Sequence, residues 1–110
     1  MALRVAVLAS GRGSNLLSLL RHIHAGHVDA TVSLVVADRA DAGALDIARK
    51  AKVPAALALV PDAGEKRASY DQRLLEVLQA DAPELVVLAG YMRLVGPATL
   101  VQQARPPFGI

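Results

Sequence analysis

Short apolar runs alternate with amphipathic stretches along this chain. Nearly continuous apolar runs are typical of strands that are covered on both faces, and they occur at residues 4–9, 32–37, 55–60 and 85–89. Apolar positions spaced three and four apart predict helices between these runs, at residues 16–23, 44–51 and 65–80. The alternation predicts an α/β protein with a Rossmann-like parallel sheet of four strands, in the order 3-2-1-4, with flanking helices.

A glycine-rich turn follows the first predicted strand and leads into the first predicted helix. It reads Gly11-Arg12-Gly13-Ser14-Asn15. Backbone N–H groups at a helix N-terminus lack intrahelical partners and carry partial positive charge, so such a turn favours a bound phosphate. Glycine lets the backbone approach a ligand without an intervening Cβ, and Ser14 or Asn15 is expected to cap the helix. The turn is therefore a candidate phosphate site at the carboxyl edge of the sheet.

Composition narrows the function classes. The 110 residues suffice for one domain, and 54% apolar with 20% charged residues excludes intrinsic disorder. Aromatic residues make up 3% of the chain and the formal net charge is +2, which argues against nucleic acid as a partner. Cysteine is absent, and no apolar run approaches the roughly 20 residues of a membrane span. We expect a cytoplasmic protein that binds small molecules, with no membrane and no nucleic acid among its partners.

Three histidines, His22, His24 and His27, lie near the end of the first predicted helix. His22 and His24 are two residues apart and therefore lie on different faces of a helix, and no cysteine or carboxylate spacing supports a metal site. Histidine near a helix C-terminus is favourable because of the helix dipole alone. The sequence predicts no metal site and no catalytic role for these residues.

A dinucleotide site is one interpretation of the glycine-rich turn. Gly11-x-Gly13 begins the fingerprint of such sites, and Asp38 follows the second predicted strand, where a ribose-binding carboxylate belongs. Leu16, however, stands in place of the third glycine, and its side chain would oppose close packing of helix and strand. Two glycines alone are weak support, and Asp38 is equally well explained as a solvated loop residue.

Four motifs together are more specific than the glycines alone. They are Ser-Gly-x-Gly-Ser-Asn-Leu at residues 10–16, Ala-Asp-Ala at 40–42, Tyr-Asp at 70–71 and Val-Leu-Ala-Gly-Tyr-Met-Arg-Leu at 87–94. In this order and spacing the chain resembles the N-terminal half of the phosphoribosylglycinamide formyltransferases, the folate-dependent glycinamide ribonucleotide transformylases of purine biosynthesis. The likeness extends to about residue 100, and it implies the α/β fold already predicted.

The resemblance implies two substrates, and no metal. A formyl group would pass from 10-formyltetrahydrofolate to the amine of glycinamide ribonucleotide, on the route to IMP. Gly13, Ser14 and Asn15 match the loop that holds the ribonucleotide phosphate. The residues that match the lining of the folate site are Arg67, Met92, Arg93, Leu94 and Val95.

One departure from the family pattern concerns catalysis. The family's catalytic Asn, His and Asp begin with an Asn-Ile-His-Pro signature after the fourth strand, and none of them is present in this sequence. We predict a formyltransferase-like N-terminal subdomain at residues 1–102 and a non-family tail at 103–110. The chain is expected to be truncated or frameshifted, and inactive alone.

Two other functions stay open at this point. The chain could be a catalytically dead fragment that binds ribonucleotide or folate, or a generic nucleotide-binding Rossmann module. Without a fifth strand, residues 85–89 would form an apolar edge with unpaired backbone groups. We therefore expect self-association through this edge.

Overall fold

The computed structural model of this chain describes residues 3–9 and 11–89, and these residues form an alternating β/α structure. Met92, Arg93, Leu94 and Val95, which the resemblance places in a folate site, lie outside the described residues. The helices and strands, in chain order, are β1 (Leu3–Ala9), α1 (Ser14–His24), β2 (Ala30–Ala37), α2 (Gly43–Lys50), β3 (Ala55–Ala58), α3 (Arg67–Asp81) and β4 (Leu85–Ala89). Each of the seven elements was predicted, with ends that differ by two residues or fewer.

The strands form one parallel sheet in the order β3-β2-β1-β4, as the sequence predicts. Its register aligns the last residues of the four strands, because Ala9 lies beside Ala37 and Ala89, and Ala37 lies beside Ala58. The carboxyl edge of the sheet is therefore level and is made of small side chains. Ligands of such sheets bind beyond this edge.

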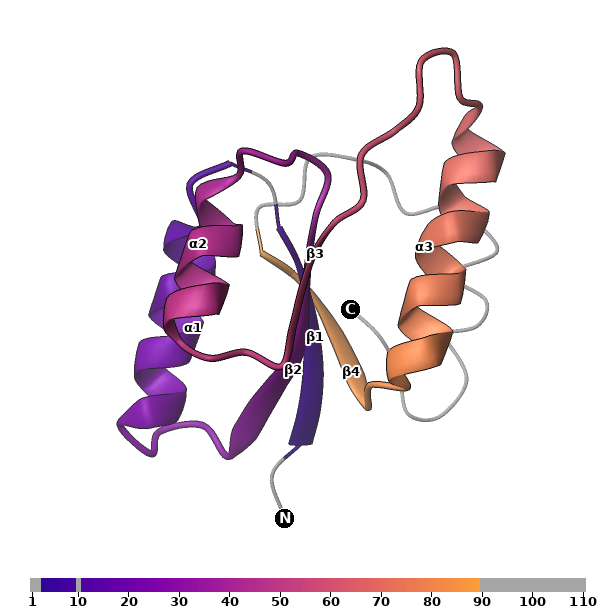
Figure 1. The fold of residues 1–110 in the computed structure, drawn as a ribbon. Coiled ribbons are helices and arrows are strands. Elements are labelled where there is room, and N and C mark those ends of the chain that lie inside the picture. Colours follow the sequence, from indigo (N-terminus) through magenta and orange to yellow (C-terminus); the bar gives the residue numbers. More distant parts are fainter. Residues whose placement is uncertain (1–2, 10, 90–110) are drawn as a thin grey trace.

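The helices cover the sheet on both faces (Figure 1): α1 and α2 lie on one face, and α3 lies on the other. The apolar core is divided in the same way. The α1–α2 cluster contains buried side chains such as Val7, Leu16 and Leu45. The α3 cluster lies across the sheet and contains Leu8 and Leu74 among others. This division explains why the strand sequences are almost uniformly apolar, since both faces of each inner strand are buried.

A bulge in β2 connects the amino edge of the sheet to the end of α3. Ser33 is the extra residue, because Val5 pairs with Val32 while the next residue of β1 pairs with Leu34. The Ser33 hydroxyl donates a hydrogen bond to Asp81 Oδ2 at 2.8 Å, and Arg4 lies 3.5 Å from Asp81 Oδ1. These polar contacts fix one end of α3 at the edge opposite to the candidate site.

No helix among residues 3–9 and 11–89 is long and apolar enough to cross a membrane.

Candidate functional site

Two loops meet at the carboxyl edge of the sheet, one after β1 and one after β2. The Ala44 N–H donates a hydrogen bond to the Gly11 carbonyl oxygen at 3.3 Å. A Cβ added to Gly43 would lie 2.7 Å from the Arg12 carbonyl oxygen, so the backbones of the two loops are in direct contact. The start of α2 therefore supports the glycine-rich turn from one side.

The two glycines of the turn serve different purposes. Gly13 has φ +82°, and a Cβ added there would lie 2.6 Å from the Cα of Ala44, so glycine is required for the packing of the loop. Gly11 has φ +69°, and nothing lies within 4 Å of an added Cβ. From the sequence, both glycines were expected to let the backbone approach a ligand. The space beside Gly11 agrees with that role, whereas Gly13 is needed for the contact with α2.

The N-terminus of α1 carries no side-chain cap, and the expectation that Ser14 or Asn15 caps it is wrong. The N-cap residue is Gly13, and no side chain accepts a hydrogen bond from the first turn. The cause is tertiary: the close contact with Ala44 requires a residue without a Cβ at the cap position. Ser14 and Asn15 instead lie exposed in the first turn of the helix. The first-turn N–H groups of α1 are thus uncapped among the described residues, which is the arrangement that favours an anion.

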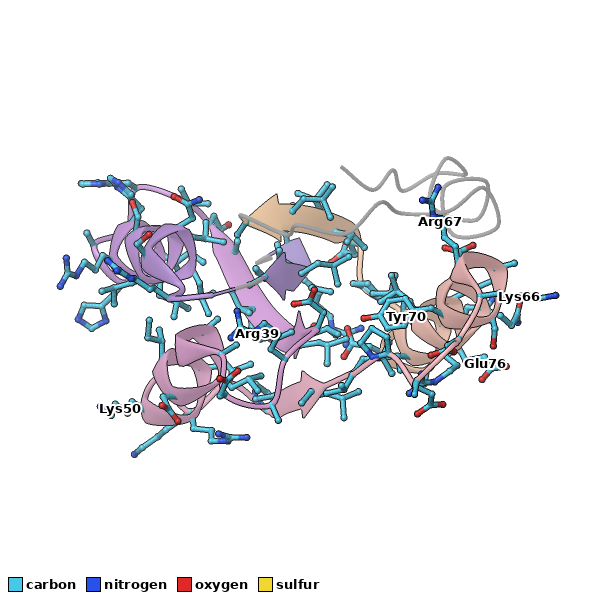
Figure 2. The ribbon with its side chains drawn as sticks, turned by 90° about the horizontal axis from the view of Figure 1, so that it is seen from above. Arg39, Lys50, Lys66, Arg67, Tyr70 and Glu76 are labelled. Carbon is cyan, nitrogen blue, oxygen red and sulfur yellow. The ribbon has the colours of Figure 1, made fainter. Side chains whose placement is uncertain are left out.

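A pocket of about 510 Å³ opens beside this turn. Its lining residues come from the two loops, and they are Gly11, Arg12, Arg39, Asp41, Ala42 and Gly43. The Arg39 Nε lies 3.3 Å from Asp41 Oδ1, and both side chains are largely exposed. Figure 2 shows Arg39 near the sheet on the side of α1 and α2. The pocket offers two guanidinium groups, which suit phosphate because they present several N–H donors in a plane.

Arg67 lies at the same edge of the sheet but on the opposite face. It is the first residue of α3 and is exposed, and Figure 2 shows its side chain and that of Lys66 pointing in different directions. The phosphate-loop residues Gly13, Ser14 and Asn15 are contiguous at the start of α1. The structure therefore places Gly13, Ser14 and Asn15 at the start of α1 and Arg67 at the start of α3, on the two faces of the sheet. The other residues predicted for the folate site lie outside the described residues.

The loop that leads into α3 is held by polar contacts. Arg73 Nη1 lies 2.6 Å from Glu65 Oε1 and also donates to the Val60 carbonyl oxygen at 3.3 Å. Glu65 Oε1 accepts a hydrogen bond from the Asp62 N–H at 2.9 Å, and Oε2 accepts one from the Ser69 hydroxyl at 3.1 Å. The Asp62 N–H, followed by Ser69 and Arg73, lowers the pKa of Glu65 below its ordinary value of 4.5.

The inner face of α3 is more polar than its sequence pattern predicts. Asp71 carries a charged side chain, yet it is 4% exposed and lies among the buried residues of the helix. Beside it in the sequence, the Tyr70 hydroxyl donates a hydrogen bond to the Leu59 carbonyl oxygen at 2.7 Å. Apolar spacing identified this face of α3 to within about one residue. Spacing gave no sign that Asp71 is buried, and the only sequence signal for this residue was its place in the Tyr-Asp motif.

The described residues contain no group of three or more His, Cys, Asp or Glu side chains that could hold a metal ion. The burial of Leu16 weakens the interpretation of the turn as a dinucleotide site. Leu16 is fully buried in the α1–α2 cluster, so a bulky side chain separates helix and sheet where the fingerprint has glycine.

Comparisons with known proteins agree with the fold. The formyl transferase family model matches residues 3–108. Among curated relatives, the phosphoribosylglycinamide formyltransferase of Escherichia coli is 38% identical over 96 residues, which cover 87% of this chain and 45% of the relative. That of Bacillus subtilis is 35% identical over 97 residues, covering 88% of this chain and 49% of the relative.

A similar solved structure is glycinamide ribonucleotide transformylase 1 from Symbiobacterium toebii. It is 41% identical with a TM-score of 0.83, and the match covers 97% of this chain and 48% of that one. The chain thus spans about half the length of the relatives that it matches.

Proposed function

We propose that this chain, which belongs to the formyl transferase family, is the ribonucleotide-binding N-terminal part of a phosphoribosylglycinamide formyltransferase. Its substrate there is glycinamide ribonucleotide, whose amine receives a formyl group from 10-formyltetrahydrofolate. A cytoplasmic location and small-molecule partners accord with this role. The observation that carries the proposal is the uncapped N-terminus of α1 beside a pocket with two arginines.

The phosphate binds at the start of α1 in this proposal. The N–H groups of Ser14 and Asn15 precede the first helical hydrogen bond, which joins the Leu17 N–H to the Gly13 carbonyl oxygen at 2.9 Å. They donate to the phosphate oxygens, and the helix dipole adds partial positive charge at the same place. Arg12 and Arg39 neutralise the rest of the phosphate charge from the pocket wall.

Arg67 contributes a cation to the folate side of the site. Its position in the first turn of α3 places it at the carboxyl edge, across the sheet from the phosphate loop. Met92, Arg93, Leu94 and Val95 complete this side by resemblance. A pteridine ligand needs an apolar slot with backbone groups at its rim, which a loop of this composition can supply.

Catalysis needs further groups. Attack of the amine on the formyl carbon gives a tetrahedral intermediate, which requires hydrogen-bond donors for its oxyanion and a group that moves a proton from nitrogen to the leaving folate. The sequence has no match to the family's Asn-Ile-His-Pro signature. We therefore propose that the 110-residue chain binds substrate without turnover.

Calorimetric titration of the whole chain with glycinamide ribonucleotide tests this proposal. The same titration with the ribonucleoside that lacks the phosphate should give binding at least tenfold weaker, and NAD should not compete. Equal affinity for the ribonucleotide and for the ribonucleoside without phosphate would contradict the assignment of the phosphate loop. Formyl transfer by the purified chain would show that the catalytic part of the proposal is wrong.

The folate side is tested with a matched pair of variants. Arg67→Ala should weaken binding of a tetrahydrofolate analogue, whereas Lys66→Ala removes an exposed cation that points elsewhere and should not. If both variants weaken binding equally, Arg67 acts only through net charge and has no specific place in the site.

A further inference from the structure

Helix α1 ends in a hydrogen-bonded turn that fixes the positions of two histidines. The C-cap is Ala25, the Gly26 N–H donates to the Ile23 carbonyl oxygen at 3.1 Å, and the His27 N–H donates to the His22 carbonyl oxygen at 2.9 Å. Gly26 has φ +81°. These paired bonds and the left-handed glycine define a Schellman motif. The motif brings the side chains at its first and last positions together, and here those positions are His22 and His27.

In Schellman motifs these two positions frequently hold apolar side chains in contact. Here the Nδ1 atoms of His22 and His27 are 3.2 Å apart, and the ring centroids are 5.4 Å apart. Both residues are exposed. The turn therefore holds two exposed imidazole rings with their Nδ1 atoms at hydrogen-bond distance from each other, on a backbone that its own hydrogen bonds hold in place.

This spacing suits a metal ion. With Zn–N bonds of about 2.0–2.1 Å, two ligands of a tetrahedral ion are about 3.3–3.4 Å apart, close to the separation of the two Nδ1 atoms. Neutral imidazole is a preferred ligand of zinc, nickel and copper. We propose that His22 and His27 form a two-histidine site for a divalent transition metal ion of this class. The ion joins the end of α1 to the turn that follows it.

The rest of the coordination comes from outside the histidine pair. No third His, Cys, Asp or Glu forms a cluster with them among the described residues. Water or an external donor therefore fills the remaining positions. A cation at a helix C-terminus gains from the helix dipole, while Arg21 in the same last turn adds positive charge. We expect a lower affinity than that of sites with three or four protein ligands.

The site is independent of the proposed phosphate site. The 11 residues of α1 separate them, which corresponds to about 16 Å along the helix axis. Metal binding should therefore leave the affinity for glycinamide ribonucleotide unchanged. A failure of the formyltransferase proposal would not affect the histidine pair, and the reverse also holds.

Calorimetric titration of the whole chain with Zn²⁺ and Ni²⁺ tests the site. We expect one ion per chain, reversal by EDTA, and binding at least tenfold weaker in His22→Ala and in His27→Ala. His24→Ala is the matched control, because it removes a histidine of the same helix end that lies outside the pair, and it should bind as the parent does. Circular dichroism of each variant checks that α1 is intact.

A fourth variant tests the geometry while keeping both ligands. Gly26→Ala meets no atom within 4 Å but strains a backbone at φ +81°, so it should disturb the turn and weaken metal binding. The proposal is overturned if no ion binds at one per chain, which would leave a hydrogen bond between the two rings as the whole interaction. It is also overturned if His24→Ala weakens binding as much as His22→Ala does.

Discussion

Gly13 and Ala44 approach so closely that a Cβ on Gly13 would lie 2.6 Å from the Cα of Ala44. This contact joins the N-terminus of α1 to that of α2 across the carboxyl edge of the sheet. It also decides which residue caps α1, because only glycine fits at that position. One tertiary contact thus accounts for both the shape of the turn and its uncapped N–H groups.

Gly13→Ala should destabilise the protein far more than Gly11→Ala. Both residues have positive φ, which costs alanine about 1–2 kcal/mol, but only Gly13 lacks space for a Cβ, and overpacking adds about 1–3 kcal/mol. Urea unfolding of the two variants measures the difference. If both lose the same free energy of unfolding, the loops separate easily and the contact does not fix the turn.

Removal of the Asp41 carboxylate should strengthen phosphate binding. Asp41 pairs with Arg39 at 3.3 Å on the surface, where such pairs contribute about 0–1 kcal/mol, so the guanidinium is easily released. Asp41→Asn also removes a negative charge from the pocket. We expect its affinity for glycinamide ribonucleotide to rise about two- to fivefold, and that of Arg39→Ala to fall.

Asp46→Asn is the control for this effect. It removes an acid of α2 that pairs with Arg49 at 3.5 Å and does not line the pocket. A similar gain in affinity for Asp46→Asn would mean that the net charge of the chain, and not the pocket, controls binding. Neither Asp41→Asn nor Asp46→Asn should change the affinity for the ribonucleoside without phosphate.

The Glu65 carboxylate should make stability depend on pH in the acid range. Its pKa is lowered in the folded state, so its contribution is complete above the ordinary value of 4.5 and is lost as the pH falls through the lower folded value. Glu65→Gln should be less stable than the parent at neutral pH and approach it in acid. Denaturant unfolding from pH 6 to pH 3 measures this convergence.

Glu76→Gln provides the comparison for Glu65. It removes an exposed carboxylate from α3, the helix that follows Glu65, and the described contacts include no hydrogen bond for it. If the two variants lose equal stability across the same pH range, the network of Asp62, Ser69 and Arg73 around Glu65 contributes nothing specific.

The β4 edge should mediate self-association. Within the described residues β4 pairs only with β1, and Leu88 is 44% exposed. Unpaired apolar edges attract further strands, and a lysine on the edge opposes this. Sedimentation velocity should show concentration-dependent association that Leu88→Lys reduces. Leu57→Lys, on the opposite edge strand β3, is the control, and a monomer at all concentrations would refute the prediction.

The fold was largely predictable because the pattern of apolar residues that defines its strands and helices is local in the sequence. Strands that are buried on both faces must be apolar at nearly every position, and the two inner strands show this in the carboxyl parts of β1 and β2. The edge strand β4 is apolar throughout although it is only partly buried. Right-handed crossovers then restrict the order of the strands. The location of the proposed phosphate loop was predictable, because a turn between the first strand and the first helix must lie at the carboxyl edge.

The details that were missed depend on contacts between distant residues. Cap preferences favoured Ser14 or Asn15, but the approach of Ala44 moved the cap to Gly13. Asp71 is buried in the packing of α3 although aspartate is mostly exposed in proteins, and helical spacing alone did not predict its burial. His22 and His27 are not neighbours by helical spacing, and only the turn at Gly26 brings them together.

The central place of β1 also has a consequence for synthesis on the ribosome. All buried residues of the α1–α2 cluster except Ala89 are present once residue 48 has been made. The α3 cluster needs side chains up to Val86. While the chain grows from residue 48 to residue 86, the α3 side of β1 and β2 therefore has no complete cover. A nascent chain in this interval displays an apolar sheet face, which is the kind of surface that chaperones bind and that aggregates when it is left exposed.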